Sequence, residues 1–243
     1  MAIMLRNCLQ PYQIFRGLRA FSCSSQHTNS DKLYEMRSYV IKPKHFIDCM
    51  RLTYECIGLR TNHSKLCGFW AVELGGTLSQ TIHIWEYDSY SQRTEVRKAL
   101  SQDKKWQNEF VVHFMPMVLK QENVIMKAAP WYEMQKYLST GGVYELVSCT
   151  FLPGKREQLE HRWMQGIKAH SKYSAPVGIW FNEIGPTNQV HTLMSYKNGD
   201  EREKVIKAAS EDEEWAETVR DCNSFLTASE TKILIPTQFS PWK

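Results

Sequence analysis

The sequence has no long apolar run and none of the short motifs that mark nucleotide-binding or hydrolytic enzymes. No stretch of the 243 residues approaches the roughly 18 apolar residues that a membrane-spanning helix needs, so we predict no transmembrane span. Gly-x-Gly-x-x-Gly, the P-loop and Gly-x-Ser-x-Gly are all missing. The hydrophobic share of 42% is typical of a globular protein. We therefore predict a globular chain and assign no catalytic residue.

The patterns of metal sites and disulfide frameworks are also missing. The seven cysteines form no Cys-x-x-Cys pair, their number is odd and their spacing is irregular. This usage suits a reducing compartment. The histidines lack metal-ligand spacing as well. We predict no metal and no cofactor.

Acidic residues are absent from the first thirty positions, which hold three arginines; the first acid is Asp31. This composition is typical of a mitochondrial targeting peptide. Arg19 lies where a matrix-peptidase site has its arginine, so we predict a targeting segment over residues 1–30 that is cut after Phe21. The protein is then expected in the mitochondrion, in the matrix. The alternative is an unstructured tail on a cytosolic protein.

The rest of the chain is close to neutral. The formal net charge is +4, and the three arginines of the first thirty residues account for much of it. Nucleic-acid binding needs a broad basic surface. We therefore predict no nucleic-acid partner.

One eight-residue pattern occurs twice, as GFWAVELG at 68–75 and GIWFNEIG at 178–185. Tyr34-Glu35 and Tyr144-Glu145 match at the same spacing of 110, and His83 and His191 pair at 108. Nearly constant spacing over many matches indicates an internal duplication. We predict a first repeat over 31–130, a linker over 131–142 and a second repeat over 143–243.

Each repeat has the pattern of a ferredoxin-like unit. In the first repeat a strand over 33–41 is followed by a helix after Pro43, two strands, a helix over 91–114 and a last strand. The β-α-β-β-α-β order puts both helices on one face of the sheet. The bare faces of the two sheets must be covered. We therefore predict an α+β fold: tandem ferredoxin-like repeats packed sheet to sheet as a dimeric-type α/β barrel.

Polar and aromatic side chains share one face of the first sheet. Side chains alternate across a strand, so Ile82 and Ile84 face away from this polar set. If the isoleucines pack on the helices, the polar set faces the barrel interior as a candidate pocket. Its predicted members, with their equivalents in the second repeat, are Glu35, Arg37, Tyr39, His83, Trp85, Glu145 and His191.

Two interpretations of this face are open; in one, Glu35 holds Arg37, Arg37 binds an anion and His83 transfers protons near neutral pH. The alternative is purely structural, with Glu35 and Arg37 as a satisfied ion pair and His83 as a bonded core residue. In the second repeat Val147 and Cys149 stand at the positions of Arg37 and Tyr39. A pocket should therefore centre on the first repeat.

Several long stretches resemble the NipSnap family. They include YEMRSYVIKP, GFWAVELGG, HIWEYDSYSQRTEVRKAL, DKKWQNEF and the C-terminal ILIPTQFSPWK, and the resemblance covers residues 33–243. It implies tandem dimeric α/β-barrel domains and mitochondrial association. It also implies a role as a scaffold or signal that recruits autophagy proteins to damaged mitochondria, with vesicle traffic as a further role. The family offers no established catalytic residues to carry over.

Two functions follow as hypotheses. The first is a non-enzymatic mitochondrial scaffold whose partners are proteins, autophagy-related or other mitochondrial ones. The second is a small-molecule binder or cofactor-free enzyme that uses the barrel interior around Glu35, Arg37 and His83. By fold analogy alone, a haem would need His83, His170 or His191 as its axial ligand. Assembly into a homo-oligomer is left open.

Overall fold

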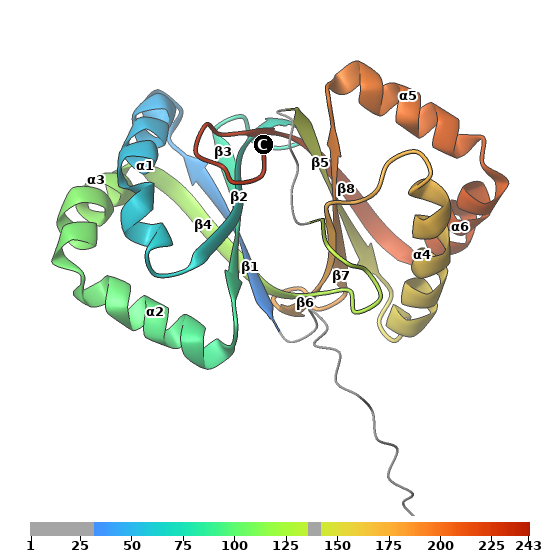
Figure 1. Cartoon of the computed structure of the whole chain (residues 1–243), viewed down its shortest axis with the longest axis horizontal. Coiled ribbons are helices and arrows are strands. Elements are labelled where there is room, and N and C mark those ends of the chain that lie inside the picture. Colours follow the sequence, from blue (N-terminus) through green and yellow to red (C-terminus); the bar gives the residue numbers. More distant parts are fainter. Residues whose placement is uncertain (1–31, 136–141) are drawn as a thin grey trace, which may run out of the picture.

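The computed structural model describes residues 32–135 and 142–243 as eight antiparallel strands in a closed barrel with helices outside it (Figure 1). The predicted targeting segment, its cleavage site and half of the predicted linker lie outside the described residues. Around the barrel the strands run β1-β3-β2-β8-β5-β7-β6-β4. The predicted fold class is therefore confirmed.

The first repeat contains four strands and a helical layer. Its elements are β1 (Leu33–Ile41), a 3-10 turn (Pro43–His45), α1 (Phe46–Thr61), β2 (Lys65–Leu74), β3 (Gln80–Tyr87), α2 (Tyr90–Gln102), a π-helix (Trp106–Val111), α3 (Val112–Phe114), a 3-10 turn (Met115–Met117) and β4 (Val118–Ala128). The single helix predicted over 91–114 is broken at Asp103. The carboxylate of Asp103 accepts a hydrogen bond from the backbone N–H of Trp106 at 3.1 Å, which caps a new helical segment.

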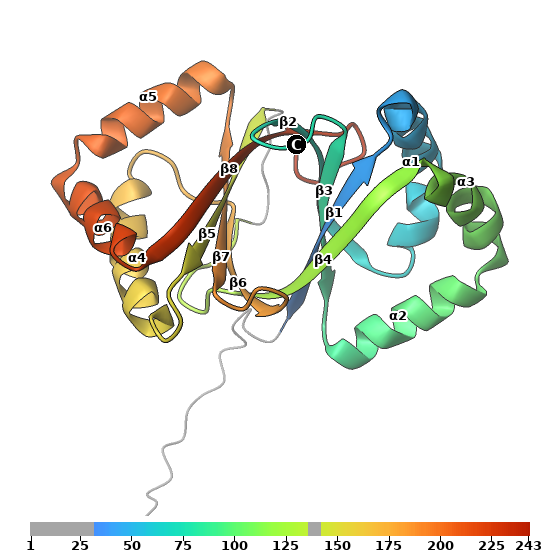
Figure 2. The same ribbon diagram turned by 180° about the vertical axis from the view of Figure 1, so that it is seen from behind.

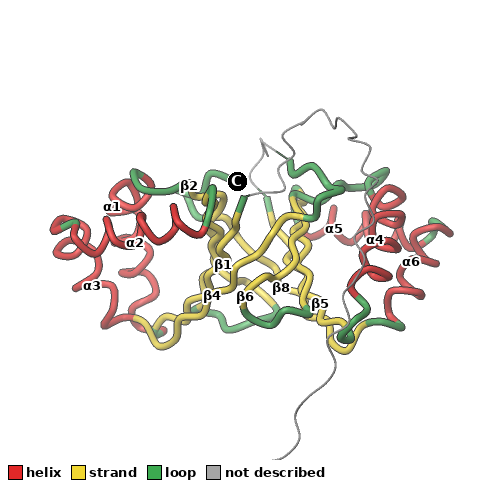
Figure 3. The backbone as a smooth tube through the Cα atoms, turned by 90° about the horizontal axis from the view of Figure 1, so that it is seen from below, coloured by secondary structure: helices red, strands yellow, loops and turns green. Residues whose placement is uncertain are grey.

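The second repeat has the same order of strands. Its elements are β5 (Val143–Phe151), α4 (Arg156–His170), β6 (Gly178–Ile184), β7 (Gln189–Tyr196), α5 (Gly199–Ser210), α6 (Glu213–Asn223) and β8 (Leu226–Pro236). Asp212 caps α6 through the N–H of Trp215, as Asp103 does in the first repeat. The pairs β2–β8 and β4–β6 join the two sheets. Figures 2 and 3 show the strands in the middle and one helical layer on each outer side.

The barrel interior is an apolar core shared by both repeats. Trp70 packs against Tyr144, and Trp180 packs against Tyr34, with ring centroids 5.4 and 6.0 Å apart. All four of these side chains are fully buried. Large aromatic surfaces buried from both sides hold the two sheets together.

The repeated Gly-x-Trp pattern serves this core. A Cβ on Gly68 would lie 2.2 Å from the ring of Trp70, and one on Gly178 would lie 2.3 Å from the ring of Trp180. Each tryptophan therefore lies flat over the glycine two residues before it, where any side chain would collide. The shared glycine and tryptophan of the pattern are explained by packing alone.

Candidate functional site

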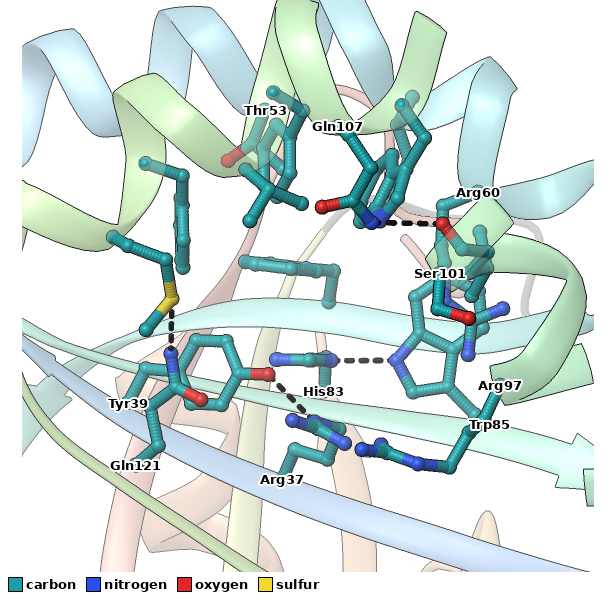
Figure 4. Close-up of a pocket in the computed structure, with 18 residues that line it drawn as sticks. Arg37, Tyr39, Thr53, Arg60, His83, Trp85, Arg97, Ser101, Gln107 and Gln121 are labelled. Carbon is teal, nitrogen blue, oxygen red and sulfur yellow. Dashed lines mark hydrogen bonds between the residues drawn. The ribbon is translucent and has the colours of Figure 1, made fainter. Parts of the chain in front are cut away.

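A cavity of the first repeat lies between its sheet and its helices. Its volume is about 310 Å³. The sheet contributes Arg37, Tyr39, Phe69, His83 and Trp85; the helices contribute Ile57, Arg60, Arg97, Trp106, Phe110 and Phe114 among others (Figure 4). Cavities of this size lie at the lower end of the range for small-molecule sites, roughly 300 to 1,000 Å³.

The expectation that this polar face points into the barrel interior is wrong. Ile82 and Ile84 belong to the core between the sheets, together with Trp70 and Trp180. Strand alternation then turns Arg37 and His83 toward the helices. The physical reason is that the inter-sheet layer is the larger apolar core, and it takes the aliphatic face of β3.

Glu35 is the centre of an ion-pair network at the edge of this cavity. Its carboxylate accepts hydrogen bonds from Arg37 at 2.8 Å, from Arg93 at 3.0 and 2.9 Å, and from Asn123 at 2.7 Å. Burial alone would raise the pKa of Glu35, but Arg93, Arg37 and Asn123 outweigh it and lower the pKa to about 2. The predicted contact of Glu35 with Arg37 is confirmed, and the network orients Arg37.

His83 has one satisfied nitrogen and one unsatisfied nitrogen. The indole N–H of Trp85 donates to His83 Nδ1 at 2.6 Å, and the imidazole stacks on Phe69 at 4.6 Å. Because an indole N–H can only donate, neutral His83 carries its proton on Nε2. His83 is 4% exposed, and its Nε2 has no hydrogen-bond partner among the described residues. Burial, helped by the charges of Arg37 and Arg60, holds the pKa of His83 well below its ordinary value.

Arg60 is a buried cation beside His83. Its guanidinium lies 4.1 Å from the ring of Trp85 and donates to the Tyr87 hydroxyl at 2.7 Å and to Ser64. Burial lowers the pKa of Arg60. No carboxylate forms an ion pair with it among residues 32–135 and 142–243. A buried charge without a counter-ion is costly, so this part of the cavity favours negative charge.

Arg37 and Arg97 lie at the mouth of the cavity. Arg37 Nε donates to the Tyr39 hydroxyl at 2.6 Å, and Arg97 reaches the same edge from α2 (Figure 4). Arg37, Arg97 and Gln121 also line an adjoining polar depression with Arg93, Glu122 and Asn123. The cavity therefore opens onto a strongly basic rim.

The second repeat has a cavity at the equivalent place, about 490 Å³ in volume. Its lining is more apolar, with Val147, Ile167, Met194 and Ile206 among the residues around it. Glu145, predicted as a pocket residue, lies here and accepts hydrogen bonds from Tyr196 at 3.2 Å and from Arg202. The imidazole of His170 contacts the Ser174 carbonyl through Nδ1 at 2.8 Å.

His191 does not belong with the cavity residues. It lies opposite Ser148, as Ile82 lies opposite Ser38, so Thr192 takes the position equivalent to His83. The predicted pairing of His83 with His191 is therefore wrong by one residue, which places the two side chains on opposite faces of their sheets. His191 contacts Ser148 Oγ at 2.8 Å and Asn182 Oδ1 at 3.1 Å. Burial and Lys232 lower the pKa of His191 to about 4.

Four of the seven predicted pocket residues line the first cavity: Arg37, Tyr39, His83 and Trp85. Sequence reasoning missed Arg60, Arg93 and Arg97. A signal for two of them was present, because Arg93 and Arg97 are four residues apart and share a helix face. Nothing in the pattern marked Arg60, because its role depends on the packing of α1 over Trp85.

Two further features concern the part of the chain that the structure describes. No three histidine, cysteine or acidic side chains there come close enough to hold a metal ion. No helix in the same residues is long and apolar enough to cross a membrane.

Comparison with known proteins identifies relatives over the whole chain. The NIPSNAP family model matches residues 34–133 and 144–241. The human protein NipSnap homolog 3A is 35% identical, covering 99% of this chain and all of its own. Mouse NipSnap homolog 3B is 33% identical, covering 98% of this chain and 97% of its own.

Solved structures support the fold at low sequence identity. An anthrone oxidase-like protein superposes with a TM-score of 0.61 at 7% identity, covering 89% of this chain and 96% of its own. This likeness concerns the fold alone. With two matched domains and relatives that span its full length, the chain belongs to the NipSnap family.

Proposed function

We propose that the protein binds a small molecule in the cavity of the first repeat. The observation that carries this proposal is the Nε2–H of His83 at the cavity wall, which has no partner in the part of the chain that the structure describes. A buried donor left without a partner costs about 1 to 3 kcal/mol. A ligand atom that accepts this hydrogen bond recovers much of that cost.

The structural alternative explains part of the polar face but not all of it. The pair of Glu35 and Arg37 is satisfied by its neighbours and fits a stabilising role. His83 Nε2 and the charge of Arg60 are not satisfied in this way. We propose binding rather than turnover and assign no catalytic residue.

Native mass spectrometry of the gently purified full chain tests this proposal. We expect a mass excess that disappears on denaturation. It should be lost in His83→Phe, which keeps the stacking on Phe69 but has no N–H, and in Ser101→Trp, which fills the cavity from exposed α2. Thr192→Val changes the equivalent position of the second repeat and should keep the excess. A bare-chain mass for the wild type, or an unchanged excess in both cavity variants, overturns the proposal.

As the alternative, we propose that the protein acts as a partner-binding scaffold in mitochondrial quality control or vesicle traffic. This function is favoured by an apolar groove of about 450 Å³ between α1 and the end of β8. Ile47 is 79% exposed there, Tyr54 52% and Ile235 37%. Exposed apolar patches commonly mark protein interaction sites.

Recruitment of autophagy proteins to damaged mitochondria, followed by microscopy, tests the scaffold. Ile47→Asp should abolish recruitment, whereas His83→Phe should leave it intact. Recruitment that survives Ile47→Asp argues against this groove.

We also propose a mitochondrial matrix location that depends on residues 1–30. Cell fractionation of the chain with and without that segment checks it.

A further inference from the structure

We infer that the first-repeat cavity takes a flat aromatic carboxylate, with its carboxylate between Arg37 and Arg97 and a hydrogen-bond acceptor on its body directed at His83. This inference rests on the proposed function and names its ligand class. It follows from the charge of the cavity, the free donors at its mouth and the shape of its aromatic wall.

The charged side chains that line the cavity are all cationic. Arg37, Arg60 and Arg97 line it, and no aspartate or glutamate among the described residues does. Glu35 lies nearby, but it is shared between Arg37 and Arg93. Two of the lining cations, Arg60 and Arg97, have no carboxylate partner among the described residues. A neutral ligand would leave this excess uncompensated, so the charge selects an anion.

The guanidinium N–H groups of Arg37 and Arg97 that remain free to donate lie at the mouth of the cavity. Arg37 uses Nε for Tyr39 and Nη1 for Glu35, which leaves Nη2 free to donate. Arg97 is exposed on α2 and makes no hydrogen bond or ion pair within the described part of the chain. Guanidinium groups bind carboxylates through paired N–H donors. The anionic group of the ligand therefore belongs at the mouth and not at the closed end.

The body of the cavity suits a flat ring system. Trp106, Phe110 and Phe114 form a ladder of stacked rings, with centroids 4.3 and 4.6 Å apart, along one wall. Phe69 and Tyr39 lie on the sheet side around His83. Such walls favour a flat aromatic body over an inorganic anion or a flexible sugar phosphate. His83 Nε2–H then donates to a hydroxyl or carbonyl oxygen on that body.

Calorimetric titration of the full chain with matched naphthalenes tests this inference. The probes are 6-hydroxy-2-naphthoate, its neutral counterpart 6-(hydroxymethyl)-2-naphthol, 2-naphthoate without the hydroxyl, and inorganic phosphate. Arg97→Gln removes the free guanidinium from an exposed site, and Lys98→Gln removes a neighbouring charge that does not line the cavity. We expect 6-hydroxy-2-naphthoate to bind most tightly and phosphate not to bind.

Arg97→Gln should weaken the carboxylate about tenfold, which corresponds to about 1.4 kcal/mol, and leave the neutral probe unchanged. Lys98→Gln should change neither. His83→Phe should remove the advantage of 6-hydroxy-2-naphthoate over 2-naphthoate.

Equal binding of the neutral and anionic probes, or wild-type affinity in Arg97→Gln, overturns the inference while leaving the cavity a ligand site. If no naphthalene binds but native mass spectrometry finds a bound molecule, the inference is wrong and the proposed function stands. Absence of both kinds of binding overturns the proposed function as well.

Discussion

The two cavities of this molecule occupy the same place in two copies of one fold, yet they differ in their polar side chains. Equivalent residues on the first strands of the two repeats are 110 positions apart, so Val147 is equivalent to Arg37. On the third strands the spacing is 109, so Thr192 is equivalent to His83. The same spacings place His170 at the position of Arg60 and Ile206 at that of Arg97. All eight residues line their respective cavities. The first cavity is therefore cationic, whereas the second is mainly apolar.

What the two copies share is structural. Glu35 with Arg93 corresponds to Glu145 with Arg202, and each carboxylate is buried. Trp106 and Trp215 follow capping aspartates in both copies. The duplication thus supplies an internal control: shared residues hold the fold, and the residues found only in the first copy are the candidates for binding.

The largest expected effect is the loss of stability on removing the carboxylate of Glu35, and it should exceed the loss from the same change at Glu145. Glu35→Gln leaves Arg37 and Arg93 without their common carboxylate, and Arg37 is only 18% exposed. Breaking a buried pair in this way costs about 3 to 5 kcal/mol in the free energy of unfolding. Glu145→Gln should cost less, about 1 to 2 kcal/mol, because Arg202 is more exposed at 30% and can reach water. Urea denaturation at pH 7 measures both, and equal losses would contradict the difference.

The next largest effect is the pH dependence of folding stability that His191 contributes. Its folded-state pKa of about 4 lies below the unfolded value near 6.5, so the folded chain disfavours its protonation. The stability that His191 contributes should therefore be fully present above pH about 6.5 and fall by roughly 3 kcal/mol as the pH drops to about 4. His191→Gln should remove this part of the slope, because glutamine does not titrate. Thermal unfolding between pH 4 and 8 compares the variant with the wild type; parallel profiles would show that His191 is not responsible.

A smaller loss of stability, equal in the two repeats, is expected when alanine replaces the glycine of each Gly-x-Trp pattern. Gly68→Ala and Gly178→Ala each drive a methyl group into the ring of the following tryptophan. Overpacking of this kind costs about 1 to 3 kcal/mol. We expect losses that agree between the two variants when measured by chemical denaturation. A large loss in one and none in the other would show that the Gly-x-Trp pattern does not have the same role in both copies.

The sequence predicted the fold well because the duplication was visible in it. The predicted strand over 33–41 agrees with β1, and the predicted order of strands recurs in both repeats. The orientation of the polar face was not predictable in the same way. Both faces of each sheet are buried, so alternation separates Ile82 from His83 without saying which one faces the barrel.

The position of His191 was missed for a local reason. The turn between β6 and β7 is one residue shorter than the turn between β2 and β3, which changes the spacing from 110 to 109. A histidine at a spacing of 108 therefore points to the other face. Arg60 was missed because its partners Trp85 and Tyr87 come from a different element.

Nitrogen NMR of the full chain labelled with 15N-histidine tests whether His83 Nε2–H is the donor that a ligand of the first cavity meets. We expect His83, assigned from the spectrum of His83→Phe, to be neutral at pH 7 with its proton on Nε2. Addition of 6-hydroxy-2-naphthoate should shift this Nε2–H resonance and leave His170 and His191 unchanged. A proton on Nδ1 of His83, or a response at His170 of the second cavity instead, would contradict ligand binding at His83.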